Sequence, residues 1–350
     1  MVSLGSLFSR KPQPLLGLDI SSSSLKLVEL DHDAIGNLVL KRCAIEPLER
    51  GWITDGNIEK FDEVAEAMRR LVKKSGTRTK NVAMALPPSA VITKRIILPG
   101  GLSDMELEVQ VESEANQYIP FSLDEVSLDF CVVGPSASSA GDVEVLIAAS
   151  RKEKVQDRQG LAEAAGLHPV ILDIESYSSR LATSRLIERM PNKGADTMVA
   201  LFEVGALTTS MQVICNDEVL YERDQAFGGA QLTQLIVRQY GFSAEEAESK
   251  KRSGELPEDY GTTVLQPFVE SLAQEIAWTA KVVLGDGVSH QRQSIFEILF
   301  DDRSKPDFRL WFLLQVPIGR PYPKHISGGT EGLFIGADQG QRWHCAALQT

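Results

Sequence analysis

The alternation of hydrophobic and polar positions along the chain predicts strands and helices in a mixed α/β protein. Residues 15–20 and 25–30 are two short apolar runs around four serines, a pattern that predicts a β-hairpin. Residues 61–72 place apolar side chains at the spacing of one helix face, which predicts an amphipathic helix. A further strand is expected at 82–86, directly before two prolines. The chain therefore opens as an α/β domain.

Residues 89–147 are expected to form a small module inserted into this first domain. A strand at 91–98 precedes a helix that runs to about Tyr118. The helix should begin at Ser103, because Ser103 and Glu106 have the spacing of a capping box. Two more strands around a loop of small residues complete a strand–helix–strand–strand unit. We expect a unit of this kind to have its own small core.

The strand–turn–strand pattern of the opening occurs a second time. Residues 197–204 and 207–215 predict two strands around a Gly-Ala turn, and a third strand ends at Gly228 and Gly229 before a helix. The repetition predicts two similar halves. The expected domains are 1–88 with 148–193 for the first half, 89–147 for the insert, 194–280 for an incomplete second half, and 281–350 for a divergent or non-native tail.

Composition and charge exclude several classes of protein. The 350 residues are 43% hydrophobic and 24% charged, which is ordinary for a folded protein. Lys and Arg number 36 against 48 Asp and Glu, and a net charge of −12 disfavours binding to nucleic acid. The sequence has neither an apolar run long enough to span a membrane nor an apolar core of a secretory signal. The four cysteines form no Cys-x-x-Cys pair, so free thiols in a reducing compartment are expected.

The serine-rich hairpin is the first candidate for chemistry. Backbone N–H groups and hydroxyls of a tight turn can converge on an anion, and a lysine on the returning strand adds positive charge. An aspartate at the strand end could hold a hydrated Mg²⁺. The residues concerned are Asp19, Ser21, Ser22, Ser23, Ser24 and Lys26. The alternative is that four serines only make a soluble turn.

Three glycine-containing segments are further candidates. Glu203 and Gly205 lie in the equivalent turn of the second half, and Gly228 and Gly229 precede a helix whose unpaired N–H groups would favour phosphate. Gly328 and Gly329 form another glycine pair, which a nucleotide could approach closely. For both glycine pairs an ordinary turn is the alternative. Complete P-loop, dinucleotide-binding, zinc-protease and nucleophile-elbow motifs are missing from the sequence.

Together these elements resemble the actin–Hsp70 ATPase superfamily, in which two similar halves hold ATP between their hairpins. The resemblance implies ATP and Mg²⁺ as cofactors, with Asp19 and Glu203 holding the metal through water. It also implies that a helix at 243–250 lies against the adenosine and brings Glu246 and Lys250 to the site. The alternative for this helix is an ordinary charged and solvated surface.

A closer resemblance, over roughly residues 8–277, is to the type IV pilus assembly protein PilM family, an FtsA-like branch of that superfamily. Four segments carry it: 16–30, 112–126, 164–169 and 172–177. The most family-specific part is Tyr118-Ile119-Pro120-Phe121, inside the insert. The resemblance implies an actin-like ATPase fold with two similar halves, an FtsA-like inserted subdomain and an atypical C-terminal end.

The function that this resemblance implies is a cytoplasmic ATP-binding scaffold at the inner face of the inner membrane. Its partner would be the N-terminal peptide of PilN, bound beside the inserted subdomain near Tyr118, with PilO, PilP and the pilus motor ATPases reached indirectly and the membrane only through partners. An FtsA-like cell-division or filament-forming protein and a hydrolysing ATPase remain alternatives.

Two departures from the family pattern affect these expectations. The catalytic candidates are Asp19, Glu175 and Glu203, but Glu203 stands where relatives usually carry Asp, so nucleotide binding should survive better than hydrolysis. Glu175 could equally be an acid that stabilises a helix N-terminus. After Ala277 the similarity is expected to end, which suggests an altered reading frame, a new tail or a divergent end, and puts half of the adenosine pocket in doubt.

Overall fold

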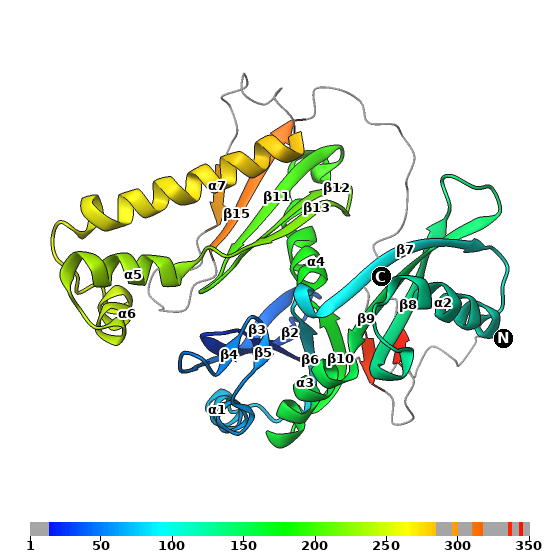
Figure 1. Cartoon of the computed structure of the whole chain (residues 1–350), viewed down its shortest axis with the longest axis horizontal. Helices are drawn as coiled ribbons and strands as arrows, with labels where there is room; N and C mark the ends of the chain where they lie inside the picture. Colours follow the sequence, from blue (N-terminus) through cyan, green and yellow to red (C-terminus); the bar gives the residue numbers. More distant parts are fainter. Residues whose placement is uncertain (1–13, 285–295, 300–309, 318–334, 338–342, 346–350) are drawn as a thin grey trace. The chain divides into compact units, whose positions relative to one another are not determined.

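The computed structural model describes residues 14–284, 296–299, 310–317, 335–337 and 343–345, with side chains described for 14–275. The chain divides into two compact units (Figure 1). Unit 1 comprises Met1–Leu181 with Pro323–Thr350, and unit 2 comprises Ala182–Tyr322. The boundary falls inside helix α4 (Glu175–Ile187), whereas the sequence placed it after residue 193.

The main sheet of unit 1 has seven strands in the order β17-β16-β10-β6-β1-β2-β3. Their bounds are β1 (Leu16–Ile20), β2 (Ser24–His32), β3 (Leu38–Pro47), β6 (Asn81–Leu86), β10 (His168–Ile174), β16 (Ile335–Ala337) and β17 (Trp343–Cys345). β1 and β2 form the predicted antiparallel hairpin. β6 is parallel to both β1 and β10, so these three strands end at one edge of the sheet.

Helices α1 (Phe61–Ser75) and α3 (Lys152–Ala164) cover one face of this sheet (Figure 1). The apolar stripe predicted for α1 is confirmed, since Val64, Met68 and Leu71 are fully buried in the same core as Leu25 and Leu27 of β2. Helix α1 ends at Gly76, whose positive φ of 62° suits glycine. A small ribbon of β4 (Ile53–Thr54) and β5 (Asn57–Ile58) precedes α1.

The insert is a separate strand–helix–strand–strand unit, as the sequence predicts. It contains β7 (Val91–Pro99), α2 (Asp104–Tyr118), β8 (Val126–Pro135) and β9 (Asp142–Arg151), in a sheet of order β7-β9-β8. The capping box is confirmed, because Ser103 and Glu106 exchange both side-chain-to-backbone bonds. Leu107, Val111 and Ala115 of α2 pack on the sheet and give the insert its own core.

Unit 2 has a five-stranded sheet in the order β13-β12-β11-β15-β14. Its strands are β11 (Thr197–Val204), β12 (Thr209–Cys215), β13 (Glu218–Gln225), β14 (Phe296–Leu299) and β15 (Leu310–Pro317). The meander β11–β12–β13 repeats β1–β2–β3. The repetition stops there, because β1 has a parallel neighbour in β6 while β11 pairs antiparallel with β15.

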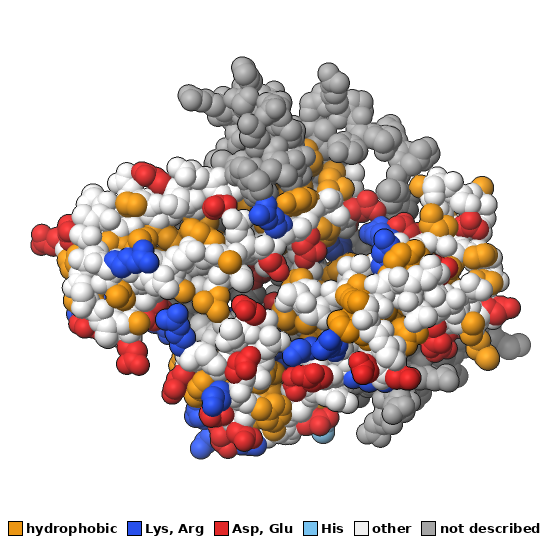
Figure 2. All heavy atoms as spheres, viewed as in Figure 1, with side chains coloured by type: hydrophobic (Ala, Val, Ile, Leu, Met, Phe, Trp, Pro, Cys, Tyr) orange, Lys and Arg blue, Asp and Glu red, His pale blue; other side chains and the backbone are white. Residues whose placement is uncertain are grey.

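The helices of unit 2 are α5 (Gly229–Tyr240), α6 (Ala244–Ser253) and α7 (Gln266–Leu284), with a π-helical turn at Gly261–Leu265. The rings of Phe227 and Phe268 stack with centroids 5.2 Å apart and join the sheet to α7. Hydrophobic side chains remain visible over these helices (Figure 2), and Leu265 and Val269 are exposed.

The turn between β11 and β12 packs directly on the start of α5. The N–H groups of Gly229 and Ala230 donate to the carbonyl oxygens of Gly205 and Ala206, at 3.0 and 2.8 Å. A Cβ on Gly228 would lie 2.6 Å from the Gly205 oxygen and 2.7 Å from the Ala206 oxygen. Because backbone atoms cannot move aside as a side chain can, this contact requires glycine.

We therefore expect Gly228→Ala to lower the free energy of unfolding by about 1–3 kcal/mol, the usual cost of overpacking. Gly229→Ala is the matched control, since its Cβ would meet no atom closer than 3.8 Å, an ordinary contact. Urea unfolding followed by circular dichroism measures both variants. Equal stabilities of the two variants would contradict the proposed contact.

Candidate functional site

The hairpin of unit 1 brings an acid and a base together beside its turn. Asp19 of β1 and Lys26 of β2 are register partners. Lys26 Nζ lies 2.9 Å from Asp19 Oδ2 and 3.2 Å from Ser21 Oγ. Both side chains keep some contact with solvent, at 22% exposed for Lys26 and 27% for Asp19. The structure thus places three of the predicted residues in one accessible cluster.

The four serines have different roles in the turn. Ser21 closes it, because its N–H and hydroxyl both donate to the Ser24 carbonyl oxygen, at 3.1 and 2.9 Å. Ser24 is fully buried. The backbone N–H groups of Ser22 and Ser23 donate to no other group within the described residues. Two open N–H donors next to Lys26 are an arrangement suited to an anion.

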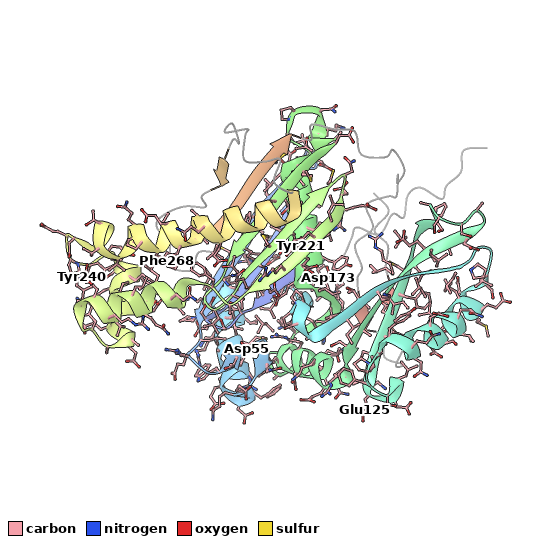
Figure 3. The ribbon with its side chains drawn as sticks, turned by 45° about the horizontal axis from the view of Figure 1, so that its top comes forward. Asp55, Glu125, Asp173, Tyr221, Tyr240 and Phe268 are labelled. Carbon is pink, nitrogen blue, oxygen red and sulfur yellow. The ribbon has the colours of Figure 1, made fainter. Side chains whose placement is uncertain are left out.

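The ends of the parallel strands place two more acids at the same edge of the sheet. Asp173 is the penultimate residue of β10, and Glu175 is the first residue of α4. Asp173 is 4% exposed, and burial raises its pKa to about 6 although hydrogen bonds from the Ile174 N–H and the Ser178 hydroxyl lower it. These bonds are 2.7 and 2.9 Å long, and Figure 3 marks Asp173. Asp173 is a titratable group that the sequence analysis did not identify.

Arg158 of α3 is a buried cation associated with this edge. Its side chain is 2% exposed, and its Nη2 donates to the Gly56 carbonyl oxygen at 3.2 Å. A Cβ on Gly56 would lie 2.6 Å from Cγ of Pro87, which directly follows β6, so the two residues pack closely. Burial lowers the pKa of Arg158, while the charges of Glu175 and Asp19 raise it. Arg158 therefore partly neutralises the two predicted acids, a role that only the packing of α3 reveals.

In unit 2 the structure changes the interpretation of the glycine pair. Glu203 of β11 pairs with Ser210 of β12, and the turn is closed by a 2.8 Å bond from the Gly205 N–H to the Thr208 oxygen. The expectation that the helix after Gly228 and Gly229 begins with unpaired N–H groups is wrong for its first two donors, because both bond the turn. That these glycines contact a nucleotide stays a prediction.

Two neighbouring lysines of α6 have different partners, and the predicted contact of Glu246 and Lys250 with a nucleotide stays a prediction. Glu246 and Lys250 form a surface pair at 3.8 Å. Lys251 instead reaches the start of α5, with its Nζ 2.8 Å from Thr233 Oγ1 and 2.6 Å from Glu248 Oε2. Burial would raise the pKa of Glu248, yet hydrogen bonds from Lys251 and Thr233 lower it below its ordinary value. Neighbouring residues on a helix point about 100° apart. The spacing in the sequence therefore did not show that Lys251, and not Lys250, would face α5.

Metal binding by Asp19 and Glu203 stays a prediction. Within the described residues, no group of three or more His, Cys, Asp or Glu side chains could hold a metal ion. A hydrated Mg²⁺ needs only one or two carboxylates when phosphate supplies further ligands, so Asp19 and Glu203 remain candidates.

Two further findings concern the rest of the chain. The predicted glycine pair Gly328 and Gly329 lies outside the described residues. No helix in the described part of the chain is both long and apolar enough to cross a membrane.

Comparison with known proteins gives a family match over most of the chain. Residues 17–299 match the family described as type IV pilus assembly protein PilM. The match continues beyond Ala277, where the similarity was expected to end, so that expectation is corrected.

The chain is also similar to several solved structures. The chain is similar to a structure titled a PilM–PilN type IV pilus biogenesis complex, at 29% identity and a TM-score of 0.61, over 77% of this chain and 76% of that one. It is also similar to the ethanolamine utilization protein EutJ from Carboxydothermus hydrogenoformans, at 17% identity and a TM-score of 0.47, over 78% and 73%. MreB5 of Spiroplasma citri bound to ADP matches at 12% identity and a TM-score of 0.35, over 69% and 62%.

The buried carboxyl group of Asp173 predicts a pH-dependent stability. Its pKa is near 3.8 as a free group and about 6 in the fold, so the folded protein binds the proton more tightly. Between these values the wild type loses stability as the pH rises, whereas Asp173→Asn has no such proton to lose. From pH 4 to pH 7 the wild type should therefore lose up to about 3 kcal/mol of unfolding free energy relative to Asp173→Asn. Urea unfolding at several pH values measures it, and a constant difference would contradict it.

Proposed function

The chain belongs to the type IV pilus assembly protein PilM family, and we propose that it is a cytoplasmic ATP-binding scaffold that holds the N-terminal peptide of PilN. The observation that carries this proposal is the similarity, over three quarters of the chain, to a structure titled a PilM–PilN complex. Through PilN the protein would connect to PilO, PilP and the pilus motor ATPases at the inner face of the inner membrane. The same match favours this role over that of a cell-division filament protein.

The peptide site that we propose lies beside α2 of the insert. The inward face of α2 packs into the core of the insert, but Tyr118, the last residue of the helix, is 45% exposed. Lys94 Nζ lies 4.9 Å from the centre of the Tyr118 ring, and Arg151 lies 4.1 Å from that of Phe121. Tyr and Arg side chains are enriched among the residues that dominate binding to a partner, so this exposed group fits a peptide contact.

We expect Tyr118→Ala to weaken binding of a synthetic PilN N-terminal peptide about tenfold, or about 1.4 kcal/mol. Met105→Ala is the matched control, because Met105 is 77% exposed at the other end of the same helix. Fluorescence anisotropy with a labelled peptide measures both variants. If the peptide fails to bind the folded wild type, the scaffold proposal is wrong, whereas equal loss in both variants removes only the assignment to Tyr118.

For the nucleotide, the proposed phosphate site is the turn of the β1–β2 hairpin. The support is local: two open N–H donors at Ser22 and Ser23, and the ammonium group of Lys26. That Glu203 takes part in hydrolysis of the nucleotide is also part of the proposal. The longer side chain of Glu203 makes slow turnover our expectation, so ATP would act mainly as a bound ligand.

Lys26→Gln should weaken binding of ATP with Mg²⁺ about tenfold or more, because a charge-assisted bond to phosphate is lost. Binding of the PilN peptide should stay unchanged. Lys60→Gln, at an exposed position before α1, removes the same charge elsewhere in unit 1 and serves as the control. Isothermal titration calorimetry measures all three proteins. Equal ATP affinity of the wild type and Lys26→Gln would exclude the hairpin as the phosphate site.

A further inference from the structure

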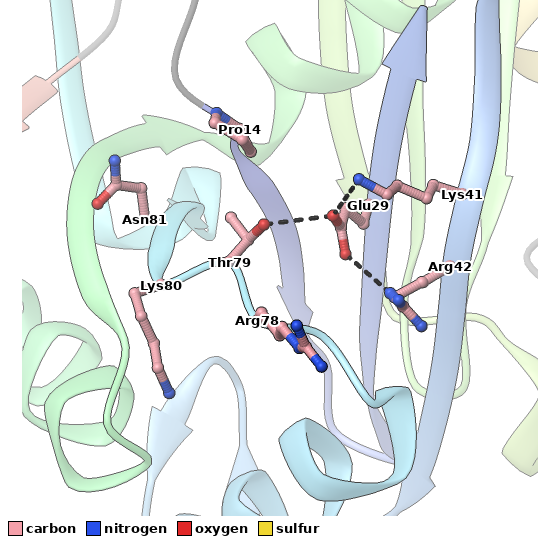
Figure 4. A pocket seen from close by; sticks show the side chains of 8 residues that line it. All are labelled: Pro14, Glu29, Lys41, Arg42, Arg78, Thr79, Lys80 and Asn81. Carbon is pink, nitrogen blue, oxygen red and sulfur yellow. Dashed lines mark hydrogen bonds and ion pairs between the residues drawn. The ribbon is translucent and has the colours of Figure 1, made fainter.

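A polar pocket lies at the edge of the unit 1 sheet opposite the hairpin turn, where the parallel strands begin (Figure 4). It has a volume of about 450 Å³, within the usual range for small-molecule sites. Its lining comes from the segment before β1, from β2 and β3, and from the start of β6: Pro14, Glu29, Lys41, Arg42, Arg78, Thr79, Lys80 and Asn81. Because the hairpin turn lies at the other end of β1, this pocket is distinct from the proposed ATP site.

The one carboxylate in the lining, that of Glu29, already has hydrogen-bond and ion-pair partners within the protein. Glu29 is 3% exposed, and its oxygens accept hydrogen bonds from Thr77 Oγ1 at 2.8 Å and Thr79 Oγ1 at 3.2 Å. Lys41 Nζ lies 3.2 Å from one oxygen and Arg42 Nε 3.3 Å from the other. Burial would raise the pKa of Glu29, but the hydrogen bonds from Thr77 and Lys41 lower it below its ordinary value. Glu29 is therefore ionised and offsets a single positive charge.

Lys41 also lies 3.2 Å from Asp31 Oδ2, so the positive charge of the pocket that has no partner within the described residues is that of Arg78 and Lys80. Arg42 Nε is buried and, despite its distance from Glu29, is not aligned for a hydrogen bond with any described group. The side chains of Arg78 and Lys80 are exposed and form no hydrogen bond or ion pair within the described residues. In a chain of net charge −12, the four cations of the lining outnumber the two carboxylates that pair with them, Glu29 and Asp31, so the pocket is a local site of opposite sign.

We propose that this pocket binds a small phosphorylated molecule. The polar side chains of the lining come from β2 and β3, from the loop before β6 and from β6 itself, so several elements of the sheet contribute to it. A planar carboxylate is satisfied by one guanidinium fork, whereas the three terminal oxygens of a phosphate accept from several directions. Arg78 supplies a planar fork and Lys80 a compact charge, while Lys41 and Arg42 stay paired with Glu29.

Inorganic pyrophosphate is the probe, titrated calorimetrically into full-length protein carrying Lys26→Gln so that the hairpin contributes little. We expect saturable binding at one site. In this background, the double substitution Arg78→Gln with Lys80→Gln should weaken binding about tenfold or more. The double substitution Arg50→Gln with Lys60→Gln removes the same charge from exposed positions of unit 1 outside the pocket and should leave affinity within about twofold.

Three results would overturn the proposal. Pyrophosphate that produces no heat at millimolar concentration would exclude the site, and equal weakening by the two double substitutions would reduce it to a general charge effect. Citrate that binds as tightly as pyrophosphate would exclude selectivity for phosphate. A fourth measurement distinguishes a lipid headgroup from a soluble ligand: Arg78-dependent sedimentation with phosphatidylglycerol vesicles would overturn the soluble source. ATP and peptide affinities do not enter these tests, so they remain informative if the scaffold proposal fails.

Discussion

The register between β1 and β2 is the constraint on which the candidate site of unit 1 depends. Pairing Asp19 with Lys26 places both on one face of the sheet, while Leu18, Ile20, Leu25 and Leu27 point into the core beneath. A slip of one residue would bury the charges and expose the leucines, so the core fixes the register. The parallel pairing of β1 with β6 then brings the turn to the edge where β10 ends. Hydrophobic burial thus sets the geometry of the polar groups.

The two units use different solutions at equivalent turns. In unit 1 the turn is closed by Ser21, which leaves the N–H groups of its central serines open. In unit 2 the turn gives its carbonyl oxygens to α5, and Gly228 permits the close approach. Donors used for packing are no longer available to a ligand. The similar sequence patterns therefore produce one turn with open donors and one turn locked onto a helix.

The sequence allowed the locally determined features to be predicted. The hairpin, the stripe of α1 and the Ser103–Glu106 capping box follow from periodicity and spacing, and all are confirmed. The burial of Arg158 and the raised pKa of Asp173 depend on segments far apart in the chain, which spacing does not report. The pairing of the first N–H groups of α5 could not be predicted for the same reason. The carbonyl oxygens that accept from them lie in a turn more than twenty residues earlier in the chain.

Two lysine–carboxylate pairs in unit 1 show how burial decides which charge remains available to a ligand. Asp19 and Lys26 are both partly exposed, and water can replace either partner at little cost, so Lys26 can exchange Asp19 for a phosphate. Glu29 is buried, and separating it from its donors would leave an unpaired charge in the interior. Lys41 is held by Glu29 and also by Asp31, so the exchangeable charge of the pocket must come from Arg78 and Lys80. The accessible cations, and not the closest ion pairs, are the ones free to recognise an anion on this acidic protein.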